Sequence, residues 1–352
     1  MSGESSVRLA AKAVRHHPRL LWAAVALAAC VLPLSDRLLP RDLAIAAHLP
    51  AVFAFAVAGL GLTVLTGFAG LLNLGAAAFV AVGAYSYAIL TWSGYPFQLG
   101  FWLGLLAAVA AGALAGVALA IPTLRLRGDY VAIVTLGAGE IVQDLLRNLD
   151  PITLGTQGIN PLPRPMLPGL EFAPDRYLPY YYLYLVLLAV AVLAVSNLRR
   201  SRLGRAWVAL RDDELAARAL GIDTPRVKLA AFATCAALCA AGGALLAALY
   251  GSSIEPGYYD FQLSVILVCI VIVGGLGSIP GALLGALVMI GFNAIVLAKA
   301  ADWMNRHGLS GGSVFSQPGN WKFLIFGLAL VLMARFRPGG LIPARARPEG
   351  GR

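Results

Sequence analysis

Predominantly apolar runs of about 20 residues recur along almost the whole chain, and they constrain its fold more than any other feature. Each run is long enough for a helix to cross a hydrocarbon core of about 30 Å. Hydrophobic residues make up 59% of the chain and charged residues 12%, against about 25% charged residues in a soluble domain. The alternating short segments of a membrane β-barrel are absent from the sequence. The sequence therefore predicts an all-α polytopic integral membrane protein, with residues 1–352 forming one transmembrane domain.

The positions of the apolar runs predict about ten transmembrane helices, within a range of eight to ten. The fifth run contains Asp129, Glu140 and Asp144, so a partly re-entrant segment stays open there. An even number of crossings places both termini on the same side of the membrane. We expect the spans near residues 20–38, 43–65, 70–92, 98–121, 129–147, 178–197, 228–250, 262–279, 281–299 and 321–335.

The Lys and Arg residues set the orientation of these spans. Most of the 27 fall in segments that this topology puts on one side, and cytoplasmic segments of membrane proteins are rich in Lys and Arg. The cytoplasmic segments then include an N-terminal tail (1–19), a short connection with Arg125 and Arg127, a loop (198–227) and a C-terminal tail (336–352). The longest outer loop is 150–177. Because the net charge of +10 lies beside the spans, it does not indicate a nucleic-acid partner.

The N-terminus and the cysteines each allow a second interpretation. The tetrapeptide LAAC at Leu27 to Cys30 resembles a lipoprotein processing site, but we interpret the segment as an uncleaved first helix. All four cysteines lie in apolar runs without neighbouring His, so we interpret them as small packing residues and expect no metal site.

The most densely charged stretch, GRAWVALRDDELAARALGIDTPRVKL, lies in the expected cytoplasmic loop. It predicts one short amphipathic helix with Trp207 and Leu210 on its apolar side and weakly apolar Ala216, Ala217 and Leu220 continuing that side. Gly221 suits the end of a helix, because glycine tolerates positive φ. A plain connector needs no such helix, so we interpret it as a docking element for a cytoplasmic partner.

If ATP drives transport by this chain, another subunit must bind the nucleotide. A phosphate-binding loop of the Walker type needs Gly-Lys-Ser/Thr, and none of the four lysines follows a glycine. Two other classes stay open. An ion-coupled secondary transporter would use buried carboxylates such as Glu140, and a membrane enzyme would need an active-site cluster that the sequence lacks.

Two segments interrupted by glycine, 67–85 and 274–288, lie in the two halves of the chain. Broken helices at corresponding positions of two halves are a pointer to a transport pathway, while glycines spaced by four also serve close helix packing. Both interpretations stay open. Polar residues inside the membrane are costly and often functional, so the candidates for the path are Asn73, Thr135, Glu140, Ser264 and Ser278.

Five ordered blocks of the sequence resemble the bacterial branched-chain amino-acid ABC permeases, and in particular their LivM-like subunits. These blocks are GFAGLLNLGAAAFVAVGAY, LRLRGDYVAIVTLGAGEIV, LGTQGI, GRAWVALRDDELAARALGI and IVGGLGSIPGALLGA, and they span roughly residues 45–335. The resemblance implies an ABC importer permease bundle in the bacterial inner membrane. It implies import of Leu, Ile and Val, with urea, amides or other amino acids as alternatives.

The resemblance also implies the partners. They are a second homologous permease, two cytoplasmic subunits that bind ATP and Mg²⁺, an extracytoplasmic substrate-binding protein and membrane lipid, with no cofactor in this chain. The charged helix is then a coupling helix seated in a groove of the ATP-binding subunit. The general importer motif Glu-Ala-Ala-x-x-x-Gly fits imperfectly, because Leu215 stands where the Glu should be. The implied coupling residues are Gly204, Arg205, Ala209, Arg211, Asp212, Asp213, Glu214, Ala217 and Gly221.

Overall fold

A computed structural model gives the fold of this chain. It describes residues 32–33, 46–124, 126, 129–166, 172–173, 176–297, 299, 321–337 and 339–343. The N-terminal tail, the tetrapeptide ending at Cys30 and all of the expected first span near 20–38 except residues 32–33 therefore lie outside the described residues.

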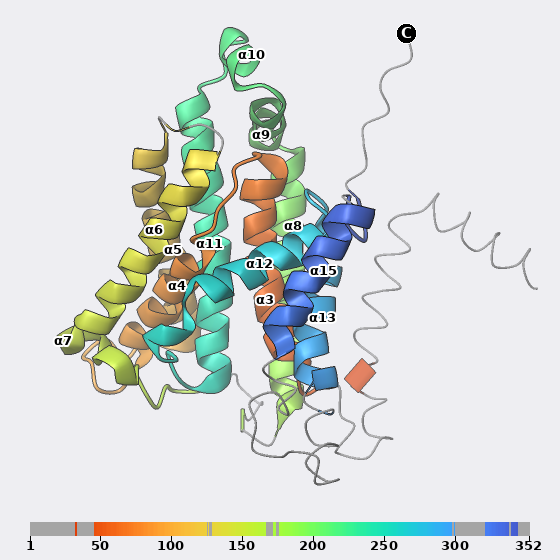
Figure 1. The fold of residues 1–352 in the computed structure, drawn as a ribbon. Coiled ribbons are helices and arrows are strands. Elements are labelled where there is room, and N and C mark those ends of the chain that lie inside the picture. The colour runs from red at the N-terminus through yellow and green to blue at the C-terminus, as the bar shows by residue number, and fades with distance from the viewer. Residues whose placement is uncertain are drawn as a thin grey trace, which may run out of the picture.

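Helices make up nearly all of the described chain (Figure 1). The nine other expected spans each coincide with a helix. The long elements are α3 (Leu49–Leu62) continued by the π-helix η2 (Thr63–Phe68), α4 (Ala76–Thr91), α5 (Phe101–Thr123), α6 (Asp129–Asn148), α8 (Tyr177–Arg200), α11 (Thr224–Tyr250), α12 (Phe261–Gly274), α13 (Ile279–Gly291) continued by the π-helix η5 (Phe292–Leu297), and α15 (Lys322–Phe336). The short elements are α7 (Asp150–Thr153), η3 (Gly155–Gln157), α9 (Arg202–Asp212), α10 (Glu214–Ala219) and η4 (Pro256–Tyr258).

Five of the described helices are long and apolar enough to cross a membrane: Leu49–Phe68, Phe101–Thr123, Tyr177–Arg200, Thr224–Tyr250 and Ile279–Leu297. Ala76–Thr91, Phe261–Gly274 and Leu324–Met333 are apolar but shorter. A helix rises about 1.5 Å per residue, so the 16 residues of α4 extend only about 24 Å. The helices α4 and α12 are therefore shorter than the expected spans 70–92 and 262–279, because glycines break both segments. By contrast, α6 is one continuous helix of 20 residues.

The long helix α11 lies at the centre of the bundle and packs against α3, α4 and α5 (Figure 1). Small residues make these contacts close. A methyl group on Gly243 of α11 would lie 2.0 Å from the carbonyl oxygen of Val80 in α4, and one on Gly83 of α4 would lie 2.1 Å from that of Ala240 in α11. A methyl group on Gly112 of α5 would meet α11 in the same way. These positions need glycine because the two backbones touch.

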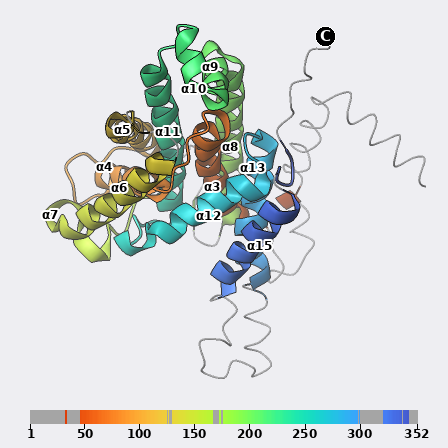
Figure 2. The ribbon, with the colours of Figure 1, turned by 45° about the horizontal axis from the view of Figure 1, so that its top comes forward.

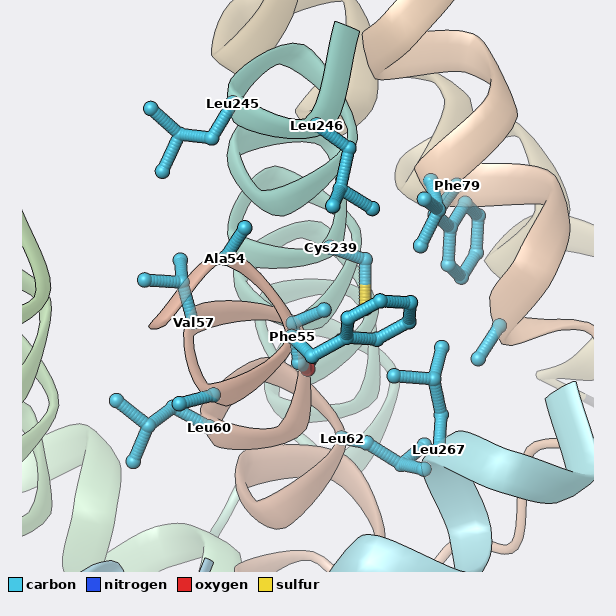
Figure 3. Packing of buried hydrophobic residues seen from close by; sticks show 14 of the residues in the cluster. Ala54, Phe55, Val57, Leu60, Leu62, Phe79, Cys239, Leu245, Leu246 and Leu267 are labelled. Carbon is cyan, nitrogen blue, oxygen red and sulfur yellow. The ribbon is translucent and has the colours of Figure 1, made fainter. Parts of the chain in front are cut away.

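The apolar core fills the space between α3, α4, α11 and α12 (Figure 3). Phe55, Leu60 and Leu267 are among its buried residues, and the Cys239 thiol donates a hydrogen bond to the Ala58 carbonyl oxygen at 3.5 Å. Three of the four cysteines, Cys235, Cys239 and Cys269, are described and buried, as expected for packing residues.

Both glycine-interrupted segments are broken helices, as predicted. Between η2 and α4 the chain is irregular from Ala69 to Gly75, and Gly70 has a φ of +72°. Between α12 and α13 it turns sharply, with φ of +126° at Gly275 and +74° at Gly277. Only glycine adopts such angles without strain. The break also lets α12 lie obliquely across the bundle (Figure 1 and Figure 2).

The connecting segments gather at two opposite ends of the bundle (Figure 1). At the α9–α10 end, a methyl group on Gly67 would lie 2.5 Å from the Gly277 nitrogen, so the two helix breaks meet there. At the α7 end, the Tyr95 hydroxyl donates to the Ile152 carbonyl oxygen at 2.7 Å, and Ile159 N donates to Ser253 Oγ at 2.7 Å. The segments that the topology assigns to one side of the membrane therefore lie at one end.

Candidate functional site

The charged stretch forms two helices, α9 and α10, where the sequence predicted one. Asp213 separates them with an extended backbone at φ −159° and ψ +115°. Its carboxylate accepts hydrogen bonds from Leu215 N at 2.8 Å and Ala216 N at 3.1 Å, so it caps α10. Ser201 caps α9 by accepting from Gly204 N. Gly221 has a φ of +81° just after α10, as its place at a helix end predicted.

Trp207 anchors α9 to the bundle. Its side chain is fully buried, and its indole nitrogen donates to the Val227 carbonyl oxygen of α11 at 3.0 Å. Gly204 lets α9 fold back onto the end of α8, because a methyl group there would lie 2.3 Å from the Arg199 carbonyl oxygen. The apolar side of α9 that the sequence predicted therefore packs against this chain.

Glu214 ties α10 to the start of α11. Its carboxylate lies 3.0 Å from Lys228 Nζ and 2.7 Å from Arg218 Nη2. The Lys228 side chain is 4% exposed, and Arg218 Nε also donates to Thr224 Oγ1 at 2.8 Å. A lysine buried this deeply depends on its carboxylate partner, so α10 is held in a fixed position on α11.

Replacing Glu214 with Gln is expected to lower the free energy of unfolding by about 1–3 kcal/mol, because it leaves the Lys228 ammonium with a neutral partner. Adding Lys228→Met should recover most of that loss. Thermal unfolding of the detergent-purified chain measures both effects. The matched control is Asp223→Asn, which breaks the exposed pair with Arg226 and should cost about 0–1 kcal/mol. Equal losses for Glu214→Gln and Asp223→Asn would contradict the role of the buried pair.

Two large apolar side chains at α10 are exposed, Leu215 within the helix and Leu220 directly after it. Leu220 is 81% exposed and Leu215 is 61% exposed, while Ala217 is buried. The sequence predicted that Ala216, Ala217 and Leu220 continue the apolar side of Trp207 and Leu210. That was wrong for Leu220, which is exposed because α10 ends at Ala219, and the break at Asp213 separates all three from α9. The sequence comparison identified Leu215 only as a mismatch to the importer motif. Glu214 points inward to Lys228, so its neighbour Leu215 points away from the bundle.

The remaining predicted coupling residues lie on α9. Arg205 and Asp212 are exposed, Ala209 is half-buried, and Arg205 Nη1 donates to the Arg200 carbonyl oxygen at 3.0 Å. Arg211 is also exposed, but its Nη1 donates to the Gly67 carbonyl oxygen at the end of η2. The loop thus combines residues that fix it to the bundle with residues that face outward.

Four of the five candidate path residues lie around the start of α4. The irregular segment before α4 leaves backbone amides without helical partners, and polar side chains accept from them. Thr135 Oγ1 accepts from Leu74 N at 3.1 Å, Asn73 Oδ1 from Gly75 N at 2.8 Å, and Ser264 Oγ from Ala77 N at 2.9 Å. Three of the candidates therefore stabilise the helix break, which is a structural task.

Glu140 lines a small cleft beside this break, together with Ser264, Asp260 and Tyr259. The cleft is shallow: about 170 Å³ of space lies there when open solvent is included, and it encloses no room for a water molecule. Burial raises the pKa of Tyr259 well above its ordinary value, so the phenol stays neutral and donates to the Ser253 carbonyl oxygen at 2.7 Å. The fifth candidate, Ser278, lies elsewhere: it caps α13 by accepting from Gly281 N at 3.2 Å.

The all-helical bundle, its broken helices and its anchored charged loop define a multi-pass membrane permease, and comparison with known proteins agrees. The family model described as "Branched-chain amino acid transport system / permease component" matches residues 44–334. The chain belongs to this family. It is a transport component of an ABC system and not an enzyme.

Individual relatives support the same assignment. The chain is 38% identical over 316 residues to the high-affinity branched-chain amino acid transport system permease protein LivM of Salmonella typhimurium strain LT2, covering 84% of this chain and 69% of the relative. It is equally similar to the LivM protein of Escherichia coli strain K12. LivH of the same E. coli strain is 39% identical over 106 residues, covering 30% of this chain and 32% of the relative. A comparison with solved structures found no match.

Proposed function

We propose that this chain imports Leu, Ile and Val as one of two permease subunits of an ATP-driven transporter, and that its α9–α10 loop is the docking point for the ATP-binding subunits. The protein sits in the bacterial inner membrane with both termini and this loop in the cytoplasm. ATP and Mg²⁺ are bound by the partner subunits, and an extracytoplasmic binding protein delivers substrate to the opposite end. The similarity to both LivM and LivH supports a pair of related permeases.

One observation carries the docking proposal: an exposed apolar pair, Leu215 in α10 and Leu220 directly after it, lies on a loop that the bundle holds in place. Trp207 holds α9, and the Glu214–Lys228 pair holds α10, against α11. A lone exposed leucine needs no explanation, but one on a six-residue helix and a second directly after it, both flanked by charge, are typical of a contact site. A rigid element also transmits a push, whereas a mobile loop would absorb it.

Replacing both Leu215 and Leu220 with Asp tests this proposal. Neither leucine packs into the bundle, so the permease is expected to reach the membrane in normal amounts. The ATP-binding subunits should no longer co-purify with it, and uptake should fall to background. The control is Met166→Asp, an equally exposed apolar residue (83%) in the loop at the opposite end. A doubly substituted permease that still co-purifies with its ATPases would contradict the docking site.

We further propose that substrate passes beside the cleft between α4, α6 and α12. Glu140 is exposed on α6 next to the helix break. Among the described residues, Arg147 forms its ion pair with Asp144, at 3.9 Å between Nη1 and Oδ1. Urea, amides or other amino acids remain the alternative substrates. Thermal-shift measurements of the cognate binding protein with each compound identify the substrate. An ion-coupled secondary transporter is the alternative class, and uptake by this chain alone on an ion gradient would establish it.

A further inference from the structure

Three segments far apart in the sequence meet at the α9–α10 end of the bundle. They are the end of η2 at Gly67, the turn between α12 and α13 at Gly277, and the second half of α9. The two glycines lie backbone to backbone: a methyl group on Gly67 would be 2.5 Å from Gly277 N and 2.7 Å from Gly277 Cα. Any larger residue at Gly67 would force the two helix breaks apart.

Arg211 is the residue of α9 that reaches this junction. Its Nη1 donates to the Gly67 carbonyl oxygen, which no helical amide can satisfy because η2 ends there. A methyl group on Gly277 would lie 3.5 Å from the same nitrogen, and one on Gly70 would lie 2.8 Å from Arg211 Cγ. One side chain thus bonds to the first helix break and lies beside the second. A guanidinium suits the place because it offers several donors in a fixed plane.

The turn between α12 and α13 is held from its other side as well. Leu341 N donates to the Val273 carbonyl oxygen at 2.9 Å, and Ile342 N donates to that of Gly274 at 3.0 Å. A methyl group on Gly275 would lie 2.3 Å from the Ile342 carbonyl oxygen. The turn therefore packs against residues 339–343 on one side and against Gly67, which Arg211 contacts, on the other. Because both sides of the turn are held, we expect a displacement of Arg211 to displace the turn as well.

We infer that Arg211 is the positioning residue through which movement of the α9–α10 loop reaches both broken helices. This inference rests on the proposed docking function. In this account the loop moves together with the ATP-binding subunits. The hydrogen bond of Arg211 then transmits this movement to the Gly67 carbonyl at the end of η2 and to the α12–α13 turn beside it. Coupling of this kind requires that the contact differ between the two conformations of the transporter. Loss of the contact should then separate ATP hydrolysis from transport without loosening the complex.

The test uses the complete transporter in liposomes, with both permeases, both ATPases and the binding protein. Arg211→Gln is expected to leave the amount of co-purified ATPase and the rate of ATP hydrolysis unchanged, while uptake per ATP hydrolysed falls at least tenfold. Arg211→Lys keeps a cationic donor and should recover part of that ratio. The matched control is Arg202→Gln, because Arg202 is an exposed arginine at the start of the same helix and lies outside the predicted set of coupling residues.

The outcomes separate this inference from the proposal on which it rests. An unchanged ratio of uptake to hydrolysis in Arg211→Gln would overturn the role of Arg211 while docking at Leu215 and Leu220 stands. Loss of the ATPase subunits from Arg211→Gln would make Arg211 part of the docking surface and overturn the inference. Failure of both the Gln and the Lys variants to yield folded permease would assign Arg211 a purely structural role, which also overturns it.

Discussion

Replacing Gly243 with Leu is expected to abolish folding of the permease. Gly243 lies where α11 crosses α4, and even a methyl group would come within 2.0 Å of the Val80 carbonyl oxygen. The clash is between the Cβ atom of residue 243 and a backbone carbonyl. A change of rotamer moves neither of these atoms, so the two helices must separate. Gly243→Ala should already cost about 1–3 kcal/mol or more. Size-exclusion chromatography and thermal unfolding of the detergent-extracted chain measure both variants.

The control for this prediction is Gly137→Leu in α6. Gly137 is also a glycine within a long helix, but nothing lies within 4 Å of a methyl group placed there. That variant should elute as a single folded species, and Gly137→Ala should stabilise α6 by up to about 1 kcal/mol. Similar losses at positions 243 and 137 would contradict the close crossing of α4 and α11.

Replacing Trp207 with Ala is expected to release α9 and α10 from the bundle. The fully buried ring leaves a cavity, and loss of a buried Trp costs about 3–5 kcal/mol. Because Trp207 is the largest side chain that α9 buries, the loss should fall on the loop. We expect rapid protease cleavage between residues 201 and 223, loss of co-purified ATPases and loss of uptake.

Two variants keep this prediction specific. Trp207→Phe keeps an aromatic ring but loses the hydrogen bond to Val227. Beyond packing differences, it should lower the free energy of unfolding by only about 1 kcal/mol. Trp102→Ala removes a tryptophan that is 45% exposed on α5 and should leave the loop protected. A Trp207→Ala permease with a protease-resistant loop would contradict the anchoring role.

The sequence predicted the helices well because the length of an apolar run is a local property. The breaks at Gly70 and Gly277 were also predictable, since glycines interrupt both runs. The lengths of α4 and α12 were not, because the sequence does not show how far a helix continues beside a break. The division at Asp213 could have been found: an Asp followed directly by Glu214 is typical of a new helix start.

The contacts between distant segments could not be predicted. Arg211 and Gly67 are 144 residues apart, and nothing in either segment indicates the other. The inward position of Glu214 depends on Lys228, which the sequence placed only as a flank of a span. Likewise Thr135, Asn73 and Ser264 drew attention as polar residues in apolar runs, but their task of satisfying the break before α4 required the fold.

The central claim is that the ATP-binding subunits contact this permease at α10. A photo-crosslinking residue placed at position 220, in cells that produce the whole transporter, tests it directly. Leu220 is 81% exposed, so the substitution should not disturb the bundle. The account predicts a crosslink from position 220 to the ATP-binding subunit and none from position 166. An assembled transporter that gives no such crosslink from position 220, or gives one from position 166, would contradict it.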